Sequence, residues 1–445
     1  MEYNSKYLKQ NIPFVLLLIL CFYSLMPYAL MSITLILFIV SSIVFNFKSF
    51  KYKITQQNIK SLIIQSGFYI FMIISVLYSS DKKEGLNELQ TGLPLLLLPF
   101  CFFFSTKTIE KSKLKTILLT FVTAKVFYIV YLYNYFVYRI NLSSQFDISN
   151  LSYFKKLMFC INLPFKSVIN NAINVATNPP NFFFHKAYLS MSLLFAICIV
   201  AYYFILRNKK VNLKLIVGIL LIVLFSLVLF HWFSVTNIGL YFVIGFIYLI
   251  SFFKTFKQKI LAICFIIILS VIAYNFSPIN KAINNNQRIT TNLEEVILFV
   301  KSPFSKRSIN NRKGSRAAVN SCTIDLIQKA ILFGHGVGTP KIMLNKCYET
   351  KNFELGMRYN LNSHNYYFHI ILSIGSIGFI LFAYMFYHNF KFTLTSKDLL
   401  YFSFLLIIAV NLITENIIFR AHGVLFFALF NALFYKANMD KFNLG

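Results

Sequence analysis

Solid runs of apolar residues, separated by short polar segments, repeat along most of the chain. Each run approaches the roughly 20 helical residues that are needed to cross about 30 Å of hydrocarbon. A membrane β-barrel would instead alternate apolar and polar residues along each strand. The pattern therefore predicts an all-α polytopic membrane protein with about twelve transmembrane helices. The expected spans are Ile12–Leu30, Met31–Phe47, Ser61–Tyr78, Leu93–Phe104, Thr116–Tyr138, Phe184–Leu206, Leu213–Phe233, Gly239–Phe253, Ile260–Tyr274, Tyr366–Tyr387, Leu399–Thr414 and Ile418–Tyr435.

The distribution of Lys and Arg supports this count and predicts the orientation. Basic clusters precede the first span and follow every even-numbered span, whereas the short odd-numbered loops are neutral or mixed. Because cytoplasmic loops are enriched in Lys and Arg, both termini are expected to be cytoplasmic. The net charge of +29 is then largely a topology signal. No basic domain remains for nucleic-acid binding, which we do not expect.

Two long outer loops divide the chain into three regions. Residues 1–274 hold the first nine spans and an outer loop at about 140–183, residues 275–363 form a large outer loop domain, and residues 364–445 hold the last three spans. The large loop contains 13 Lys and Arg against 5 Asp and Glu. Long translocated loops do not obey the charge rule. On charge alone, the loop is either a solvated basic surface or a site for an anion.

The large loop also carries helical signals. Apolar residues from Arg316 to Leu332 recur at near-helical spacing, which predicts an amphipathic helix. A Gly-rich turn at 334–339 ends it, and a second short helix is expected to begin at Pro340. Such a turn before a helix can hold phosphate, although a plain turn is the simpler interpretation.

Seven cysteines are present, of which two, Cys322 and Cys347, lie in the large outer loop. If that side of the membrane is oxidising, these two thiols are expected to form a disulfide. It would close a loop of about 26 residues and contribute roughly 3 kcal/mol. The cysteine spacing does not suit zinc, and no metal site is expected.

The stretch from Arg316 to Leu381 resembles the signature region of the bacterial O-antigen ligase/polymerase family, whose members are lipid-linked glycan transferases. The elements that carry the resemblance are Arg316, the helix, the turn at Gly334–Gly338, Tyr348, the segment Asn362–Tyr367 that opens a span, and the step Gly375–Gly378. The segments Phe184–Ser190 and Thr414–Gly423 are also similar to family segments. Two departures are Asn237, where relatives often have Arg or Lys, and Asn320, where relatives often have an aromatic residue.

The resemblance implies a fold like that of the membrane glycosyltransferase (GT-C-like) class. It also implies a reaction at the periplasmic face of the bacterial inner membrane, in which a glycan leaves undecaprenyl pyrophosphate for an acceptor hydroxyl. The acceptor is lipid A-core for a ligase, or another lipid-linked chain for a polymerase. We expect neither metal nor other cofactor, since positioning and charge stabilisation can supply most of the barrier reduction. The expected partners are these glycan substrates and membrane lipids.

Two residues are the candidates for catalysis. The resemblance makes His364 the group that activates or orients the acceptor, because imidazole titrates near neutral pH. The alternative is an interfacial histidine that caps the tenth span. Arg316 would bind the pyrophosphate, or else be one of many loop cations.

Further residues are candidates for the substrate cavity. Arg288 and Arg312 are expected to replace the cation that is missing at Asn237. Three candidates, His185, Glu415 and Arg420, lie at the outer ends of spans and could line the same cavity. Alternatively, they anchor the helices at the membrane interface, or Glu415 and Arg420 form a Glu–Arg pair. Lys125 should face the bundle interior, because a cation at that depth is costly in lipid, and it has a polar-network role or a structural one. His369 is interpreted as structural. The full set of substrate-binding candidates is Arg312, Arg288, His185, Tyr188, Asn237, Gly336, Gly338, Asn365, Glu415, Arg420 and Lys125.

A transporter or flippase of lipid-linked sugars is the competing class. It would also have about twelve spans and basic cavities, but it should show repeated halves with broken spans in matching positions. The sequence contains no such repeat, and the loop that precedes His364 has no counterpart in the first half.

Overall fold

The computed structural model describes residues 2–50, 53–106, 108–141, 151–162, 186–207, 212–232, 234–253, 300–305 and 312–443. Helices joined by turns make up this part of the chain, and no strand occurs within these ranges. Eight helices here are long and apolar enough to cross a membrane. The all-α polytopic class is therefore confirmed. The count of twelve stays a prediction, and the expected span Ile260–Tyr274 lies outside the described residues.

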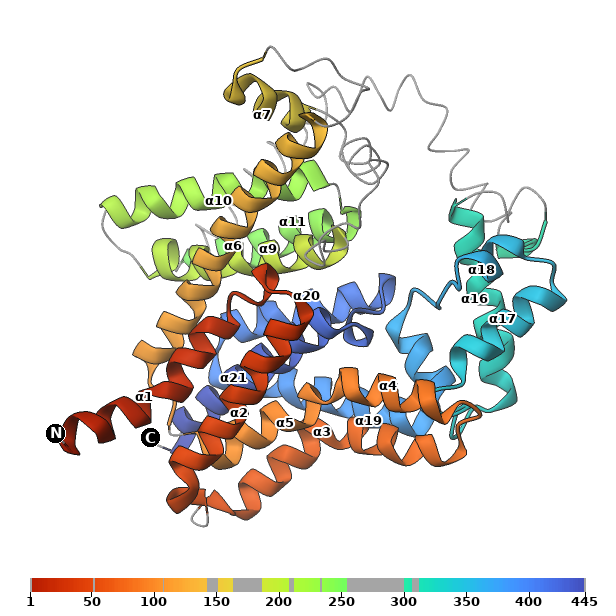
Figure 1. Ribbon diagram of the computed structural model, residues 1–445, viewed down its shortest axis with the longest axis horizontal. Coiled ribbons are helices and arrows are strands. Elements are labelled where there is room, and N and C mark those ends of the chain that lie inside the picture. Colours follow the sequence, from red (N-terminus) through yellow and green to blue (C-terminus); the bar gives the residue numbers. More distant parts are fainter. Residues whose placement is uncertain are drawn as a thin grey trace.

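The helices are named in Figure 1. The first group is α1 (Glu2–Leu20), α2 (Tyr28–Phe50), α3 (Gln56–Ser75), α4 (Lys82–Gly92), α5 (Pro94–Phe100), α6 (Lys111–Asn141), α7 (Tyr153–Asn162), α9 (Lys186–Val200), α10 (Leu213–Trp232) and α11 (Val235–Phe252). The second group is α16 (Arg312–Lys329), α17 (Pro340–Thr350), α18 (Glu354–Arg358), α19 (Tyr366–Ser396), α20 (Leu399–Thr414) and α21 (Ala421–Asn443). Short 3-10 helices are η1 (Tyr23–Leu25), η3 (Val76–Tyr78) and η6 (Ile417–Phe419), and short π-helices are η4 (Cys101–Ser105) and η5 (Ala201–Leu206).

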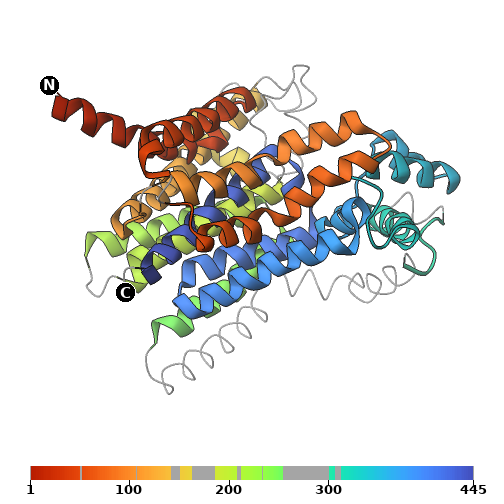
Figure 2. The same cartoon turned by 90° about the horizontal axis from the view of Figure 1, so that it is seen from below.

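The bundle has two distinct ends. Both termini lie at one end, which we call the terminal end, and α16, α17 and α18 lie at the other, which we call the loop-domain end (Figure 2). The last helix, α21, is apolar around most of its circumference and packs inside the bundle, with Phe426, Leu429, Phe430 and Leu433 almost fully buried. A helix that is hydrophobic all round is buried among others, so its composition explains its central place.

Several helices turn apolar surface outward. Leu220 on α10 is 63% exposed and Phe242 on α11 is 61% exposed. These side chains would be out of place in water, but they meet an equally apolar medium in lipid. The exposed apolar faces therefore agree with a multi-pass membrane protein.

Two expected boundaries were wrong. The first span does not reach Leu30, because α1 ends at Leu20 and α2 begins at Tyr28, directly after Pro27. The helix that contains the fourth span begins earlier than Leu93, since continuous helix runs over Lys82–Ser105. The Asp81 carboxylate accepts a hydrogen bond from the Glu84 amide at 2.9 Å and so caps this helix, which sequence analysis had treated as a mixed loop.

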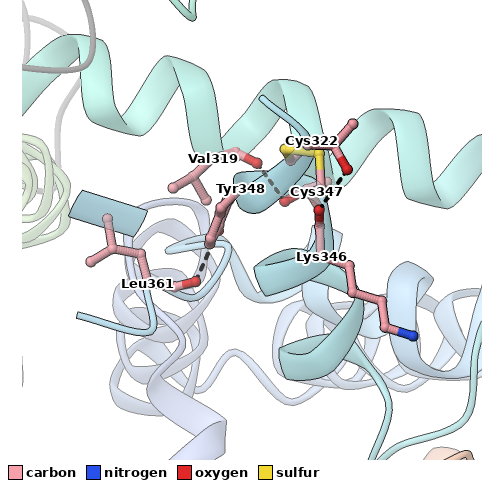
Figure 3. Close-up of a disulfide and its surroundings, with 8 residues drawn as sticks. Val319, Cys322, Lys346, Cys347, Tyr348 and Leu361 are labelled. Carbon is pink, nitrogen blue, oxygen red and sulfur yellow. Dashed lines mark hydrogen bonds between the residues drawn. A yellow bond between two sulfur atoms is a disulfide. The ribbon is translucent and has the colours of Figure 1, made fainter. Parts of the chain in front are cut away.

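The loop domain has a small core of its own. Residues from α16 and α17 form it, among them Val319, Leu326 and Leu344. Cys322 and Cys347 are joined by a disulfide, with their Cα atoms 5.9 Å apart, which links α16 to α17 (Figure 3). Both predicted helices of this loop are present. The first begins at Arg312 rather than Arg316, and the second begins at Pro340 as expected.

Candidate functional site

A charged cluster lies where three elements meet at the loop-domain end. Arg316 comes from α16, His364 from the segment before α19, and Glu415 from the turn between α20 and α21. The Arg316 Nη2 atom donates to Glu415 Oε1 at 3.5 Å. The Nδ1 atom of His364 lies 3.7 Å from Glu415 Oε2. Glu415 thus stands between the two residues that sequence analysis selected for catalysis.

Local structure fixes the place of His364. Its backbone is in the left-handed region, with φ of 46°, which a non-glycine residue adopts at some cost. The Asn362 side chain compensates by accepting a hydrogen bond from the His364 amide at 3.0 Å. Immediately afterwards Asn365 caps α19, since its Oδ1 accepts from the amides of Tyr367 and Phe368. The imidazole is therefore held at the point where the chain enters the bundle.

The loop domain supports the same segment. Tyr348 on α17 is fully buried, and its hydroxyl donates to the Leu361 carbonyl at 2.9 Å, three residues before His364 (Figure 3). Burial raises the pKa of the Tyr348 hydroxyl above its ordinary value, so the group stays protonated and remains a donor. The disulfide holds the helix that carries Tyr348 to the helix that carries Arg316.

The side chains of the cluster remain partly hydrated. The side-chain exposures are 46% for Arg316, 32% for His364 and 16% for Glu415. An ion pair in such surroundings contributes about 0–1 kcal/mol to stability, so the cluster is not explained by stability. Arg316 gives one donor to Glu415, and a guanidinium carries five N–H donors. The arrangement suits an anion next to a base.

In the Gly-rich turn, the amides of Gly336 and Gly338 donate to groups of the protein itself. The Gly336 amide donates to the Ser373 carbonyl at 2.8 Å, and the Gly338 amide donates to Ser79 Oγ at 3.0 Å. Gly336 has φ of 86°, and a Cβ there would lie 2.5 Å from the Ser79 Cα atom. The turn therefore needs glycine for close packing against the segment between η3 and α4 and against α19, and these amides are already used within the protein.

The same turn stabilises a break in α19. Gly375 has φ of 70° and interrupts the helix. The amides of Ser376 and Ile377 donate to the carbonyls of Ile331 and Leu332, so the backbone groups freed by the break are satisfied. The Gly-x-x-Gly step thus joins the membrane helix to the loop domain.

Asn237 is part of a buried amide pair with Asn411. Its Nδ2 donates to Asn411 Oδ1 at 2.9 Å, and Asn411 Nδ2 donates back to Asn237 Oδ1 at 2.9 Å. Asn237 also donates to Ser234 Oγ, and both asparagines are fully buried. These contacts join α11 to α20, so the amide has a packing role.

Three other candidates lie near the ends of their helices. Tyr188, at the start of α9, is 8% exposed and donates to the Asn416 carbonyl at 3.3 Å, next to Glu415. Arg420 is exposed and belongs to the same turn as Glu415. The side chain of Asn365 is engaged in capping α19, as described above. Tyr188 and Arg420 therefore both lie close to Glu415, the member of the charged cluster that belongs to the turn between α20 and α21.

Lys125 lies inside the bundle, as expected, and is 1% exposed. Its Nζ atom is 4.9 Å from the ring centroids of both Tyr23 and Phe121, and 5.9 Å from that of Tyr128. Aromatic faces stabilise a cation, most strongly away from water. This environment supports the structural role.

The structure does not describe the side chains of three candidates. Arg288 and His185 lie outside the described residues, and so does the side chain of Arg312. Within the described ranges, no group of three His, Cys, Asp or Glu side chains is arranged to hold a metal ion.

Sequence analysis missed a second carboxylate–imidazole pair. Glu88 on α4 and His369 on α19 lie 3.8 Å apart between Oε2 and Nε2, and both are at most 10% exposed. His369 also stacks beside Tyr366 and meets Phe419 edge-on. The only available signal was the spacing of Glu84 and Glu88, which places both on one face of a helix.

The fold and the cluster define the class: a polytopic α-helical membrane protein with a charged site at the loop-domain end. Residues 236–383, about a third of the chain, match the family model described as O-antigen ligase. No curated protein matches the chain. The matched region includes Arg316 and His364 but not Glu415, and it confirms the resemblance to the O-antigen ligase family. It supports a membrane glycosyltransferase of the ligase/polymerase type.

Proposed function

We propose that the protein transfers a glycan from undecaprenyl pyrophosphate to a hydroxyl of lipid A-core, at the periplasmic face of the bacterial inner membrane and without a metal ion. The supporting observation is the contact of Glu415 with both Arg316, at 3.5 Å, and His364, at 3.7 Å. A cation, a carboxylate and an imidazole at one hydrated membrane face provide the functions that this transfer needs.

Each residue has a role in the step. The acceptor oxygen forms a bond to the first sugar carbon of the donor while the bond from that carbon to the pyrophosphate oxygen breaks. The electron pair leaves with the pyrophosphate, whose charge Arg316 stabilises through its planar fork of donors. The hydroxyl proton passes to His364 Nε2, and Glu415 stabilises the resulting imidazolium on the Nδ1 side.

The distances fit a site before substrate binds. At 3.7 Å the contact of His364 with Glu415 is longer than a hydrogen bond. Such contacts often shorten only in the substrate complex. Arg316, at 46% exposure, is accessible to a donor whose pyrophosphate lies at the membrane surface.

The test is a transfer assay with the purified protein in lipid vesicles, supplied with lipid-linked glycan and acceptor but no nucleotide or added metal. We expect transfer by the wild type, and a loss of about 10²–10⁴-fold for His364→Gln. His388→Gln is the matched control, because His388 is a histidine on α19 toward the terminal end. Equal rates for His364→Gln and the wild type would contradict the proposal.

A polymerase of the same family is the second candidate, because ligase and polymerase share the Arg316–His364 region. The surface glycan of a deletion strain separates them: unattached full-length chains indicate a ligase, and single repeat units indicate a polymerase. A transporter or flippase is the third candidate, and it would move lipid-linked sugar across the vesicle membrane even with His364→Gln.

A further inference from the structure

A second polar site lies at the opposite end of the bundle, far along the helices from the charged cluster. It is a cavity of about 590 Å³ between the start of α6, the end of η5, the α19–α20 turn and the end of α21. Its rim holds five cations against three carboxylates. The cations are Lys111, Lys115, Arg207, Lys397 and Lys441, and the carboxylates are Glu110, Asp398 and Asp440.

The carboxylates of this cavity are already committed to the protein. Asp398 caps α20 by accepting from the Tyr401 amide, and its other oxygen accepts from the Asn438 side chain at 2.9 Å. Asp440 accepts from the Ile109 amide at 2.9 Å and pairs with Lys436 at 2.7 Å. Glu110 lies 3.8 Å from Lys113. The five lining cations therefore outnumber the three carboxylates by two, although one of them, Lys441, also donates to the Ser396 carbonyl at 3.1 Å.

Two of the cations are held over aromatic rings. The Arg207 guanidinium lies 4.7 Å from the Tyr202 ring centroid and donates to the Tyr202 hydroxyl at 2.6 Å. The Lys115 Nζ atom lies 5.8 Å from the centroid of Tyr203. Stacking on the rings already restricts these side chains, so they lose less conformational entropy when they bind an anion.

The walls of the cavity are apolar. Leu114, Leu400 and Phe434 line it together with the two tyrosine rings. A soluble anion would make no use of these walls, but a lipid would place its phosphate at the rim and its first acyl carbons against them. Four of the basic boundaries that predict the cytoplasmic side meet at this one cavity. Basic pockets between transmembrane helices on that side are typical sites for anionic lipid headgroups.

We infer that this cavity binds the phosphodiester headgroup of an anionic phospholipid of the cytoplasmic leaflet, with Lys115 and Arg207 as its main contacts. The site is separate from the transferase cluster, and it does not depend on the proposed reaction. A bound lipid would contact the start of α6, the end of η5, the start of α20 and the end of α21 at the same time.

The experiment measures lipid binding by native mass spectrometry, and thermal unfolding, of the full-length protein in mixed micelles. Phosphatidylglycerol is compared with phosphatidylcholine and with inorganic phosphate. For the wild type we expect bound phosphatidylglycerol and a rise of a few degrees in the unfolding midpoint, with little effect of the other two. The double variant Lys115→Gln/Arg207→Gln should bind phosphatidylglycerol about tenfold more weakly or worse.

The matched control is Lys60→Gln/Lys391→Gln, which removes two exposed cations from the same predicted face outside the cavity. We expect wild-type binding from it. A variant that unfolds is replaced by Lys115→Arg/Arg207→Lys, which keeps the charge and should retain binding. Equal losses in the test and control variants, an equal effect of phosphatidylcholine, or an equal effect of inorganic phosphate would each overturn the inference.

Discussion

Two polar clusters join distant helices in this protein, and they differ in charge and in contact with water. The Arg316–Glu415–His364 cluster is ionic and partly hydrated. The other consists of Gln65, Asn389 and Asn431, which link α3, α19 and α21 through amide hydrogen bonds of 2.7–3.1 Å. All three amides are at most 3% exposed.

The difference follows from the cost of removing charge from water. A neutral amide can be buried among helices when its donors and acceptors are satisfied, whereas an ionised group is far more costly there. The buried amides therefore specify how the helices pack. The ionic groups are partly hydrated, and they are the groups that we propose to act on the substrate. Variants at the two clusters should accordingly separate activity from stability.

After His364→Gln, the largest effect is expected from Arg316→Ala, which removes the proposed pyrophosphate ligand. The value of kcat/KM for the lipid-linked donor should fall about 10²–10³-fold, as for loss of a donor to transition-state charge. The midpoint of thermal unfolding should hardly change. Arg358→Ala, at an exposed arginine of the same domain, is the control. Equal losses in both variants would mean that only the total charge of the loop matters.

Removing the disulfide tests whether the ionic cluster depends on the small core of the loop domain. In Cys322→Ser/Cys347→Ser the free energy of opening of α16 and α17 should fall by about 3 kcal/mol. Hydrogen exchange of the α16 amides measures it, and transfer activity should fall in parallel because α16 carries Arg316. A reducing agent should reproduce the effect in the wild type and add nothing in the double variant. Unchanged exchange would contradict the dependence.

Asn389→Leu tests the amide cluster. It removes the group to which Gln65 Nε2 donates and one donor to Asn431 Oδ1, while the hydrogen bond from Asn431 to Gln65 remains, and the free energy of unfolding should fall by about 1–2 kcal/mol. Denaturation in mixed detergent micelles measures this, while transfer per folded molecule should stay the same. Asn345→Leu removes an amide hydrogen bond at the protein surface and serves as the control. A loss of turnover with unchanged stability would erase the distinction between the two clusters.

The smallest effect is expected from Glu415→Gln. Glutamine can still accept from Arg316, but it cannot stabilise an imidazolium at His364, so kcat should fall about tenfold while KM changes little. Steady-state kinetics check this, with Glu349→Gln on α17 as the control. A change confined to KM would assign Glu415 to substrate binding instead.

Some features were predictable because they depend on neighbouring residues. The span Leu399–Thr414 agrees with α20 at both ends, where Asp398 caps the first turn. The helix that begins at Pro340 is likewise a matter of local backbone preference. The helix Lys82–Gly92 was missed because its polar residues suggested a loop. Those residues face basic groups of other segments, since Glu84 lies 3.8 Å from Lys341 and Glu88 lies 3.8 Å from His369.

The sequence by itself determined the membrane class, the helices and their basic ends, and the selection of Arg316 and His364. Only the tertiary structure decided that Glu415 lies between them, 99 residues from Arg316 along the chain. It also decided that the amides of Gly336 and Gly338 bind protein groups and that Asn237 pairs with Asn411. The reason is physical: hydropathy, caps and turns act over a few residues, whereas these contacts exist only after separate helices have packed.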